Sequence, residues 1–463
     1  MPTIAAIATP PGAGGIGIAR LSGPRAKDIL ARMFLPFSPH FENFHPWMLY
    51  RGRVLDEGGE PFDDALAVFM PGPRTYTGED MAEVHCHGGQ LVLLTALEKM
   101  FSLGARQAGP GEFSRRAFLN GRMDLSQAEA VAEMIAAPSR EAVRYGFNRL
   151  DGLLGRRVRE LREKLDSLRA RICLAVDFPE EDAECLPPED FAAAVVQVMG
   201  AARDLLAGHK RAGFMQRGAL IALAGAVNAG KSSLLNALLG RNRALVTAHP
   251  GTTRDFLEEW CELGGLPVRL ADTAGLRETD EPVESLGVAA SREKVRSADA
   301  VLVVLDGASL GQKGALSERC PDDAALEALE LAGDRPVLYA WNKCDLCMPA
   351  VFPPLWTRDR PCCAVSALTG QHVEELARRL RDLVLGREQK PADGLAPNYR
   401  QAVSLEEAVA ELEELRADIE AGQTYDCCAV RLDAAAARLG EVTGVASPED
   451  VLNRIFDSFC VGK

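Results

Sequence analysis

The stretch Gly225-Ala226-Val227-Asn228-Ala229-Gly230-Lys231-Ser232 decides the fold of the middle of the chain. Apolar residues 219–224 precede it and predict a strand, and residues 233–239 after it predict a helix. Glycines in a strand–turn–helix unit let backbone N–H groups point inward at phosphate oxygens. We therefore expect a phosphate-binding loop, with Lys231 on the β- and γ-phosphates and Ser232 on Mg²⁺. The alternative is a chance match to a short pattern.

Four further segments follow this loop in the order that a guanine-nucleotide site requires. They are Gly251-Thr252-Thr253-Arg254-Asp255, Asp272-Thr273-Ala274-Gly275, Asn342-Lys343-Cys344-Asp345 and Ser366-Ala367-Leu368. Thr253 can give Mg²⁺ a second hydroxyl, Asp272 can hold the ion through water, and the Gly275 N–H can contact the γ-phosphate. A buried Asp345 would accept two hydrogen bonds that guanine offers and adenine does not. Five boxes in this order predict a GTPase.

One expected side chain is missing from the second of these segments. Leu276 stands where Ras-like proteins carry a glutamine that orients the attacking water. Another group must therefore position the water, and the acidic residues 278–284 are the nearest candidates. No arginine finger can be assigned.

The composition limits the class of protein. The 463 residues suggest about three domains, and the net charge of −14 means that any nucleic-acid contact must use a local basic patch. The twelve cysteines are scattered, which is typical of reduced thiols in a cytosolic protein. We expect neither a signal peptide nor an apolar run of membrane-spanning length.

The segments on either side of the nucleotide boxes differ in pattern. Residues 1–120 read as α+β; their G-x-G-x-x-G at 12–17 continues as a strand, so we reject a dinucleotide fold. His85-Cys86-His87 alternates between two faces, which favours a strand end over a metal cluster. Residues 121–214 and 386–463 read as helices, which predicts one helical domain interrupted by a GTPase domain at 215–385 with a mostly parallel sheet.

Three local predictions accompany this division. An arginine-rich stretch at 139–176 predicts one long helix, which is either an RNA-facing surface or a solvated helix face with ion pairs. Residues 307–323 contain glycine and polar residues and predict a surface loop. Ser447 is expected to cap a helix that has Pro448 in its first position.

Segments outside the boxes resemble the tRNA-modification GTPase MnmE family, also called TrmE. They are Ala8-Thr9-Pro10-Pro11-Gly12, Gly14-Gly15-Ile16-Gly17, Tyr76-Thr77-Gly78-Glu79-Asp80, Pro110-Gly111-Glu112-Phe113 with Asn120, Asp124-Leu125-Ser126-Gln127-Ala128-Glu129-Ala130, and the terminal Cys460-Val461-Gly462-Lys463. The resemblance covers essentially the whole chain. The five boxes alone also fit other translation-associated GTPases, so the N-terminal segments and the tail discriminate.

The resemblance implies a fold, a homodimer and the ligands of each domain. Residues 1–120 would bind a tetrahydrofolate derivative and form the dimer, like the folate domain of aminomethyl transferases, and residues 215–385 would be a Ras-like P-loop domain. Arg20, Glu83, Arg122 and Lys463 match the folate-contacting positions. The residues expected to bind GTP are Asn228, Ala229, Gly230, Lys231, Ser232, Ser233, Thr247, Thr252, Thr253, Asp272, Thr273, Ala274, Gly275, Asn342, Lys343, Asp345, Ser366, Ala367 and Leu368.

The resemblance also implies how the reaction is assisted. Two GTPase domains would face each other across K⁺, which takes the place of an arginine finger. The Asn228 side chain and the carbonyls of Thr247, His249 and Thr252 would bind this ion, and Glu284 would orient the water. An aliphatic residue is common at 249, so the histidine could make dimerisation depend on pH. Ala226-Val227 is a second, smaller departure from the family pattern.

Cys460 matches a cysteine that the family requires for tRNA modification. It could attack C6 of a uridine from a mobile tail, or act as a redox or positioning group. With a flavoprotein partner, MnmG, which binds FAD and NADH, such a protein adds an aminomethyl or carboxymethylaminomethyl group to C5 of the wobble uridine, in a cytoplasmic heterotetramer. The alternative is a ribosome-associated GTPase switch without modification chemistry.

Overall fold

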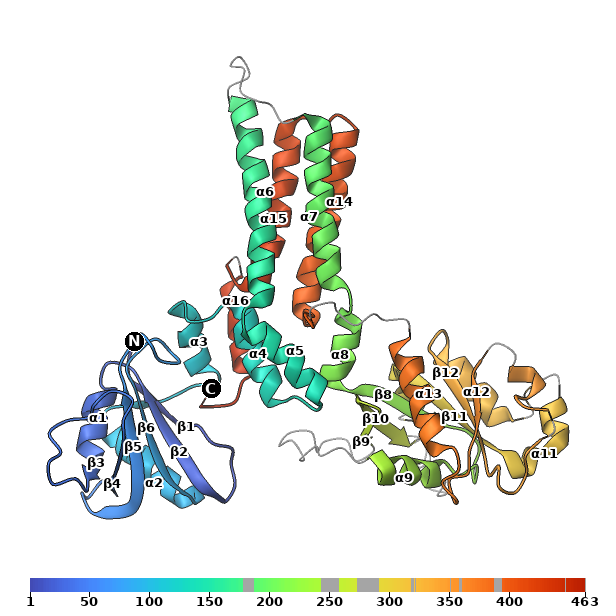
Figure 1. Cartoon of the computed structure of the whole chain (residues 1–463), viewed down its shortest axis with the longest axis horizontal. Helices are drawn as coiled ribbons and strands as arrows, with labels where there is room; N and C mark the ends of the chain where they lie inside the picture. Colours follow the sequence, from blue (N-terminus) through green and yellow to red (C-terminus); the bar gives the residue numbers. More distant parts are fainter. Residues whose placement is uncertain are drawn as a thin grey trace, which may run out of the picture. The chain divides into compact units, whose positions relative to one another are not determined.

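A computed structural model describes residues 1–177, 187–242, 258–272, 291–317, 320, 322–349, 351–357, 360–386, 394–445 and 447–462. The chain divides into two compact units (Figure 1). Unit 1 comprises Met1–Ala132, Asn148–Arg203 and Val403–Lys463, and unit 2 comprises Glu133–Phe147 and Asp204–Ala402. Unit 1 thus contains both the N-terminal sheet and the long helices, while unit 2 contains the phosphate loop.

Unit 1 begins with a seven-stranded sheet in the order β3-β4-β5-β6-β2-β1-β7. All neighbouring strands are antiparallel except β1 and β7, which are parallel. The elements are β1 (Ile4–Ile7), β2 (Gly14–Ser22), α1 (Ala26–Met33), β3 (Phe34–Pro36), β4 (Leu49–Leu55), β5 (Pro61–Met70), β6 (Met81–Gly88), α2 (Gln90–Ser102), β7 (Arg106–Gln107) and α3 (Glu112–Leu119). The glycine-rich segment at 12–17 enters strand β2, as predicted.

The apolar faces of α1 and α2 pack on one side of this sheet. Ile29 and Leu30 of α1 and Leu93 and Met100 of α2 are buried in one cluster with alternate residues of β2 and β6, such as Leu21. A smaller cluster that includes Phe113 of α3 also contains residues of β1 and β6. The period-2 pattern of the strands therefore places residues such as Arg20 and Glu83 between these packed positions.

Four long helices form the rest of the core of unit 1. They are α6 (Leu153–Asp177), α7 (Pro188–Leu206), α14 (Tyr399–Glu420) and α15 (Tyr425–Thr443), with α4 (Leu125–Ile135) and α16 (Glu449–Asp457) near them in the chain. The buried residues of α6 are Leu154, Val158, Leu161, Leu165, Leu168 and Ile172, a spacing of three and four that makes one apolar stripe. The stripe packs against α15, so segments that precede and follow the phosphate loop lie side by side (Figure 1).

The arginine-rich stretch is two helices, not the single helix that we predicted. α5 (Arg140–Leu150) ends before Gly152, whose φ of +78° is not helical, and α6 begins at Leu153. Five of its arginines form ion pairs: Arg156 with Asp151, Arg157 with Glu160, Arg159 with Asp124, Arg162 with Asp166 and Arg169 with Asp433. For these five the ion-paired helix face is the better interpretation.

Unit 2 contains a six-stranded sheet in the order β13-β12-β11-β8-β10-β9, parallel except for β9. Its elements are α8 (His209–Arg217), β8 (Ala219–Ala224), α9 (Lys231–Asn242), β9 (Glu258–Leu263), β10 (Leu266–Asp272), β11 (Ala300–Asp306), α11 (Gly307–Leu316), α12 (Asp323–Ala332), β12 (Val337–Asn342), the short 3₁₀ helix η1 (Leu355–Thr357), β13 (Cys362–Ala364) and α13 (Val373–Leu385). The predicted mostly parallel sheet is confirmed.

Helices cover both faces of this sheet. Ile221 and Leu223 pack with Leu234 of α9 and Leu380 of α13, whereas Leu220 and the other alternate residues of β8 pack with α12 on the opposite face. Because both faces are buried, β8 is apolar at every position. This arrangement brings the carboxyl ends of β8, β10, β11 and β12 to one edge, where the nucleotide boxes begin.

Two local predictions are wrong. Residues 307–316, predicted as a loop, form helix α11, because Asp306 caps its first turn and Trp356 Nε1 donates to the Gly314 carbonyl at 3.1 Å. The helix is kinked at Gly311, whose φ of +53° is not helical. Ser447 does not cap α16: Pro448 is the N-cap residue, and the Ser447 hydroxyl donates to the Glu441 carbonyl at 3.3 Å.

One stretch corrects the expectation about apolar runs. By length and composition alone, the helical residues 188–217 are long and apolar enough to span a membrane, and an 18-residue window within them has a mean hydropathy of 1.3. In the structure α7 buries Phe191, Val195 and Val198 along one side. Its Arg203 forms an ion pair with Glu413 of α14. Burial along one side is typical of a helix in a bundle.

Candidate functional site

The phosphate loop has the backbone that its sequence predicts. Gly225, Asn228 and Gly230 have φ values of +135°, +64° and +91°. A Cβ at Gly225 would overlap the Val304 carbonyl oxygen, and one at Gly230 would overlap the Asn342 side chain. Only glycine satisfies both the positive φ and the close approach at these two positions. The loop therefore keeps its shape because β11 and β12 lie directly against it.

The lysine of the loop is buried and bonded to the loop itself. Lys231 is 6% exposed, and its Nζ donates to the Gly225 carbonyl at 2.6 Å and to the Ala226 carbonyl at 2.7 Å. Burial lowers the pKa of this ammonium, and the Asp272 carboxylate opposes that shift. An anionic phosphate is a stronger partner for a desolvated ammonium than a neutral carbonyl. The side chain is thus placed to bind phosphate.

The hydroxyl and the carboxylate expected beside Mg²⁺ are already in contact. Ser232, at the start of α9, donates to Asp272 Oδ2 at 2.7 Å, and Asp272 ends β10. An oxygen-only pair of this kind is what Mg²⁺ prefers, with water and phosphate oxygens completing the shell. The described residues therefore fit the ion. They hold no group of three or more His, Cys, Asp or Glu side chains arranged for a metal.

Asn342 joins three of the nucleotide boxes, which sequence reasoning missed. Its side chain is 2% exposed, its Nδ2 donates to the Ala229 carbonyl at 2.8 Å, and its Oδ1 accepts from the Ala367 N–H at 3.0 Å. One buried amide thus holds the phosphate loop and the base loop together. The signal was present, because the box Asn342-Lys343-Cys344-Asp345 contains an amide at a strand end. Asn342 was expected to bind GTP, but not to link the two loops.

The residues expected to contact the base are arranged unevenly. Ser366 is buried, and its Oγ accepts from the Thr369 N–H at 3.1 Å, which shapes the loop. Leu368 is 88% exposed, and Asp345 is exposed rather than buried as we expected. Ser233 is also exposed, at the start of α9. The Asp345 carboxylate is therefore open to solvent in this structure, and a bound guanine would have to bury it.

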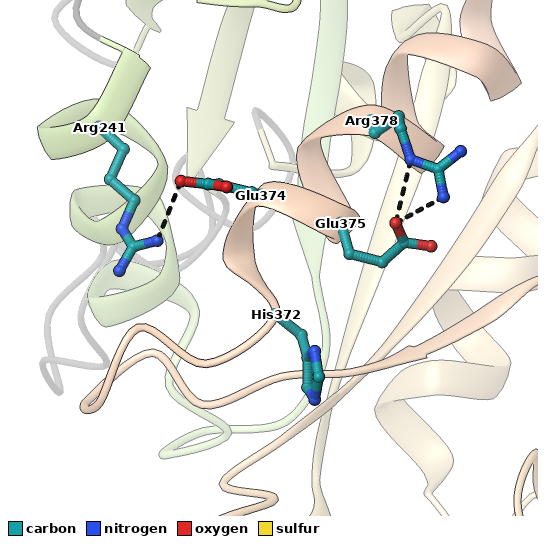
Figure 2. Close-up of a pocket in the computed structure, with 5 residues that line it drawn as sticks. All are labelled: Arg241, His372, Glu374, Glu375 and Arg378. Atoms are coloured by element: carbon teal, nitrogen blue, oxygen red, sulfur yellow. Dashed lines mark hydrogen bonds and ion pairs between the residues drawn. The ribbon is translucent and has the colours of Figure 1, made fainter.

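A pocket of about 470 Å³ lies beside this loop, lined by Arg241, His372, Glu374, Glu375 and Arg378 (Figure 2). Arg241 Nη1 lies 3.6 Å from Glu374 Oε1, and Arg378 Nη2 lies 2.5 Å from Glu375 Oε2. The Arg241 guanidinium also lies against Gly370 of the base loop. No residue that the sequence predicted for a site lines this pocket, whose charges are paired with one another.

Several predicted residues lie outside the described part of the chain. They are Thr247, His249, Thr252, Thr253, Thr273, Ala274, Gly275, Glu284 and Lys463. Of the expected K⁺ ligands, only Asn228 is described; its side chain is exposed and its carbonyl accepts from Lys343 Nζ at 2.8 Å. The roles assigned to these residues stay predictions.

In unit 1, Arg20 and Glu83 meet as cross-strand neighbours on β2 and β6. Arg20 Nε donates to Glu83 Oε1 at 2.7 Å, and His85 Nε2 lies 3.2 Å from Glu83 Oε2. Burial raises the pKa of Glu83, but the interactions with His85 and Arg20 together lower it by more, so the net shift is downward. An ionised, half-buried carboxylate beside an arginine can orient a polar ligand through hydrogen bonds.

The C-terminal tail docks next to this pair. Val461 forms a β-bridge with Pro110, and the Gly111 N–H donates to the Cys460 carbonyl at 3.4 Å. Gly462 has φ +97°, and a Cβ there would overlap the Ile7 carbonyl oxygen. Arg20 Nη1 donates to the Gly462 carbonyl at 3.5 Å. The tail is therefore docked up to Gly462 in this structure, while Cys460 is exposed, and the role of its thiol stays a prediction.

Arg122 contacts the turn at 75–80. Its Nε donates to the Thr75 carbonyl at 3.0 Å, and its stem lies against Gly78. Asn120 Nδ2 donates to the Thr77 carbonyl at 2.7 Å, so both side chains fix the turn at 75–80. The structure brings Arg20, Glu83 and the tail into contact, and the hydrogen bond that it shows for Arg122 is to the turn at 75–80.

Two family models match the chain, and together they cover most of it. The model described as "MnmE helical domain" matches residues 125–460, and that described as "GTP-binding protein TrmE N-terminus" matches residues 3–122. The "tRNA modification GTPase MnmE" of Nitratidesulfovibrio vulgaris (strain DP4) is 54% identical over 464 residues, which is 100% of this chain and 99% of that protein. The protein with the same name from Lawsonia intracellularis is 48% identical, over 100% of this chain and 99% of the other.

Solved structures match the chain in part. The G-domain of FeoB from Methanococcus jannaschii has 22% identity and a TM-score of 0.26, and covers 36% of this chain and 97% of its own. An Era variant from Aquifex aeolicus has 22% identity and a TM-score of 0.28, and covers 42% of this chain and 66% of its own. The two family models and the relatives matched over their full length show that the chain belongs to the MnmE family of tRNA modification GTPases.

Proposed function

We propose that the chain is a Mg²⁺- and K⁺-dependent GTP hydrolase that modifies the wobble uridine of tRNA together with a flavoprotein of the MnmG type. The observation that supports the GTPase part is the pair of hydrogen bonds that the Asn342 side chain forms, one with the Ala229 carbonyl and one with the Ala367 N–H. It fixes the distance between the groups that hold phosphate and those that hold a base. Such preorganisation favours one nucleotide pose, and the box that contains Asp345 selects guanine.

In this proposal, hydrolysis depends on positive charges that surround the phosphates: a lysine and two metal ions. Lys231 binds the β- and γ-phosphates, while Ser232 and Thr253 bind Mg²⁺ and Asp272 holds it through water. Asn228, with the carbonyls of Thr247, His249 and Thr252, binds K⁺, which takes over the charge stabilisation of an arginine finger when two GTPase domains face each other. Glu284 orients the attacking water.

The modification chemistry belongs to unit 1 in this proposal. Arg20 and Glu83, with Arg122 and Lys463, hold a tetrahydrofolate derivative, which supplies a one-carbon group when bound. The docking of the tail supports this assignment, because Arg20 Nη1 donates to the carbonyl of Gly462, two residues after the exposed Cys460. The partner supplies FAD and NADH, and the product carries an aminomethyl or carboxymethylaminomethyl group on C5.

The proposed domain division follows from these roles. Residues 1–120 form the folate-binding and dimerisation domain, residues 121–214 and 386–463 form the helical domain, and residues 215–385 form the GTPase domain. The packing of α6 against α15 supports a GTPase domain inserted into a helical one. We place the homodimer and its complex with the partner in the cytoplasm.

GTP turnover measured in matched KCl and NaCl buffers tests the ion part of this proposal. The rate should be at least about tenfold higher in K⁺, because a site built from carbonyl and amide oxygens can match the larger ion and lower the barrier by charge stabilisation. Equal rates in the two salts would remove K⁺, and with it the role of Asn228, from the proposal. A rate that needs neither Mg²⁺ nor Ser232 would remove the metal site as well.

A further inference from the structure

The carboxylate of Asp306, which no nucleotide box includes, lies at the edge where the boxes meet. Asp306 ends β11, and its Oδ1 accepts from the N–H groups of Ala308 and Ser309, each at 3.1 Å. Its Oδ2 accepts from Lys343 Nζ at 2.7 Å. One oxygen thus caps α11, and the other holds the lysine of the base box.

The same lysine reaches the phosphate loop. Lys343 Nζ donates a second bond, to the Asn228 carbonyl at 2.8 Å. Lys343 and Asn228 both have left-handed backbones, with φ values of +59° and +64°. Such a conformation costs free energy in a residue with a side chain and persists only where its surroundings hold it. The ammonium therefore connects two backbone segments that each need support.

The electrostatics of Asp306 suit this task. Burial raises the pKa of its carboxyl, but the bonds from Lys343 and from the backbone N–H groups lower it more, so the group is ionised at neutral pH. The Asp306 and Lys343 side chains are 22% and 31% exposed, which leaves them partly shielded from water. A charge-assisted bond in such a place restricts the lysine more than a neutral one would.

We propose that Asp306 is a positioning residue that sets the Asn228 peptide of the phosphate loop through Lys343, and so determines the affinity for the nucleotide. If the Asp306 carboxylate is lost, the Lys343 ammonium can leave the Asn228 carbonyl. The Asn228 peptide can then rotate and turn its carbonyl oxygen toward the nucleotide phosphates, which the neighbouring loop residues bind. On the proposed function, in which Asn228 also binds K⁺, the affinity for K⁺ falls as well. Asp306 itself touches neither ligand.

Two substitutions separate this role from helix capping. Asparagine and serine both cap helices, so Asp306→Asn and Asp306→Ser keep the first turn of α11 but remove the negative charge. Titration of a fluorescent GDP analogue against each full-length variant should show affinity weakened about tenfold, since loss of one charge-assisted bond is of that order. The KM for GTP should rise in parallel, while kcat at saturating GTP and K⁺ changes less than about twofold.

Asp299, just before the opposite end of β11, provides a matched control. It is 17% exposed, pairs with Arg217 at 2.7 Å and accepts from the Leu220 N–H, so it resembles Asp306 in burial and bonding. Asp299→Asn should leave nucleotide affinity unchanged even if both variants unfold at a lower temperature. Equal weakening by Asp299→Asn and Asp306→Asn would mean a general loss of stability and would overturn the proposal, as would unchanged affinity in Asp306→Asn.

A double-mutant cycle tests the route through the lysine. In a chain that already carries Lys343→Met, adding Asp306→Asn should change nucleotide affinity by less than about twofold, because the connection is already broken. Additive losses would place Asp306 on another route and reject the proposal. The GDP titration does not depend on K⁺, so a failure of the K⁺ requirement leaves this test intact. If the wild type does require K⁺, its half-activating concentration should rise in Asp306→Asn and stay unchanged in Asp299→Asn.

Discussion

The nucleotide site of unit 2 and the tail site of unit 1 are built over very different distances along the chain. The phosphate loop is a continuous strand, turn and helix, and glycines close to each other in the sequence shape it. The tail site instead joins Arg20 of β2 with Gly462, and Pro110 with Val461. A local site can be recognised from spacing alone, whereas a site made by the two ends of a chain requires the whole fold. The two sites should therefore fail separately when single residues are changed.

Substitution of Cys460 should separate the two activities, tRNA modification and GTP hydrolysis, most strongly. Its thiol is exposed on a tail whose backbone is held by Gly111 and Pro110, so Cys460→Ser changes chemistry and little else. We expect modification of the wobble uridine to be lost, while K⁺-stimulated GTP hydrolysis stays within about twofold of the wild type. Nucleoside mass spectrometry and phosphate release measure the two activities. Loss of hydrolysis in the same variant would show that the sites are not separate.

Asn342→Ala is the converse test, because it should damage the nucleotide site and leave the tail site intact. The substitution removes two bonds from a buried amide and leaves the Ala229 carbonyl and the Ala367 N–H without this partner. We expect affinity for GDP to fall about 100-fold, which corresponds to about 3 kcal/mol. Calorimetric titration of GDP checks this. Asn398→Ala is the control, because Asn398 bonds to Glu133 in the same unit, far from the loop in sequence. A similar loss in the control would contradict the assignment.

Gly462→Ala tests whether docking of the tail matters as much as its thiol. The new Cβ would overlap the Ile7 carbonyl and strain a residue with φ +97°, so the tail should leave its seat. Modification should fall about tenfold, which corresponds to about 1.4 kcal/mol of strain, with GTP hydrolysis unchanged. Val461→Ala keeps the backbone bridge and should modify tRNA normally. Full activity of Gly462→Ala would show that the docked tail is not the working arrangement.

The smallest effect concerns stability of unit 1. Glu112 accepts from Arg106, from Arg116 and from the Gly109 N–H at 3.0 Å. Burial raises its pKa, but these bonds lower it to about 2 from an ordinary 4.5. Because the folded pKa is the lower one, the charge stabilises the fold above pH 4.5, and this contribution is lost as the pH falls toward 2.

Glu112→Gln should therefore lower the free energy of unfolding by about 2 kcal/mol at pH 7 and by progressively less between pH 4.5 and 2. Urea unfolding monitored by circular dichroism at several pH values measures this. Glu449→Gln, which removes an exposed pair with Arg115, should change it by less than about 0.5 kcal/mol. A loss that is the same at pH 3 as at pH 7 would mean that the charge is not responsible.

The sequence predicted those parts whose signal is local. The strand before Gly225, the helix after it and the sheet in unit 2 follow from apolar periodicity and glycine placement. In α14, Leu405, Ala408, Leu412 and Leu415 recur at helical spacing in the sequence, and all four are buried. In each case the residues that determine the structure lie within a few turns of one another.

What was missed depends on contacts between distant segments. Helix α11 contains three glycines, and its cap Asp306 and its bond from Trp356 could not be inferred from its own composition. The double role of Asn342 needs Ala229 and Ala367, which are 113 and 25 residues away. The docked tail is the extreme case, with Arg20 and Gly462 at a separation of 442 residues. Spacing rules carry no information about such pairs.

Mass spectrometry of tRNA nucleosides tests the central claim, that one chain joins a GTPase to wobble-uridine chemistry. Cells that lack this gene should have unmodified C5 at the wobble uridine. The wild-type chain should restore the modified nucleoside, whereas neither Cys460→Ser nor Asn342→Ala should do so. Normal modification without the gene, or full restoration by Cys460→Ser, would contradict the account.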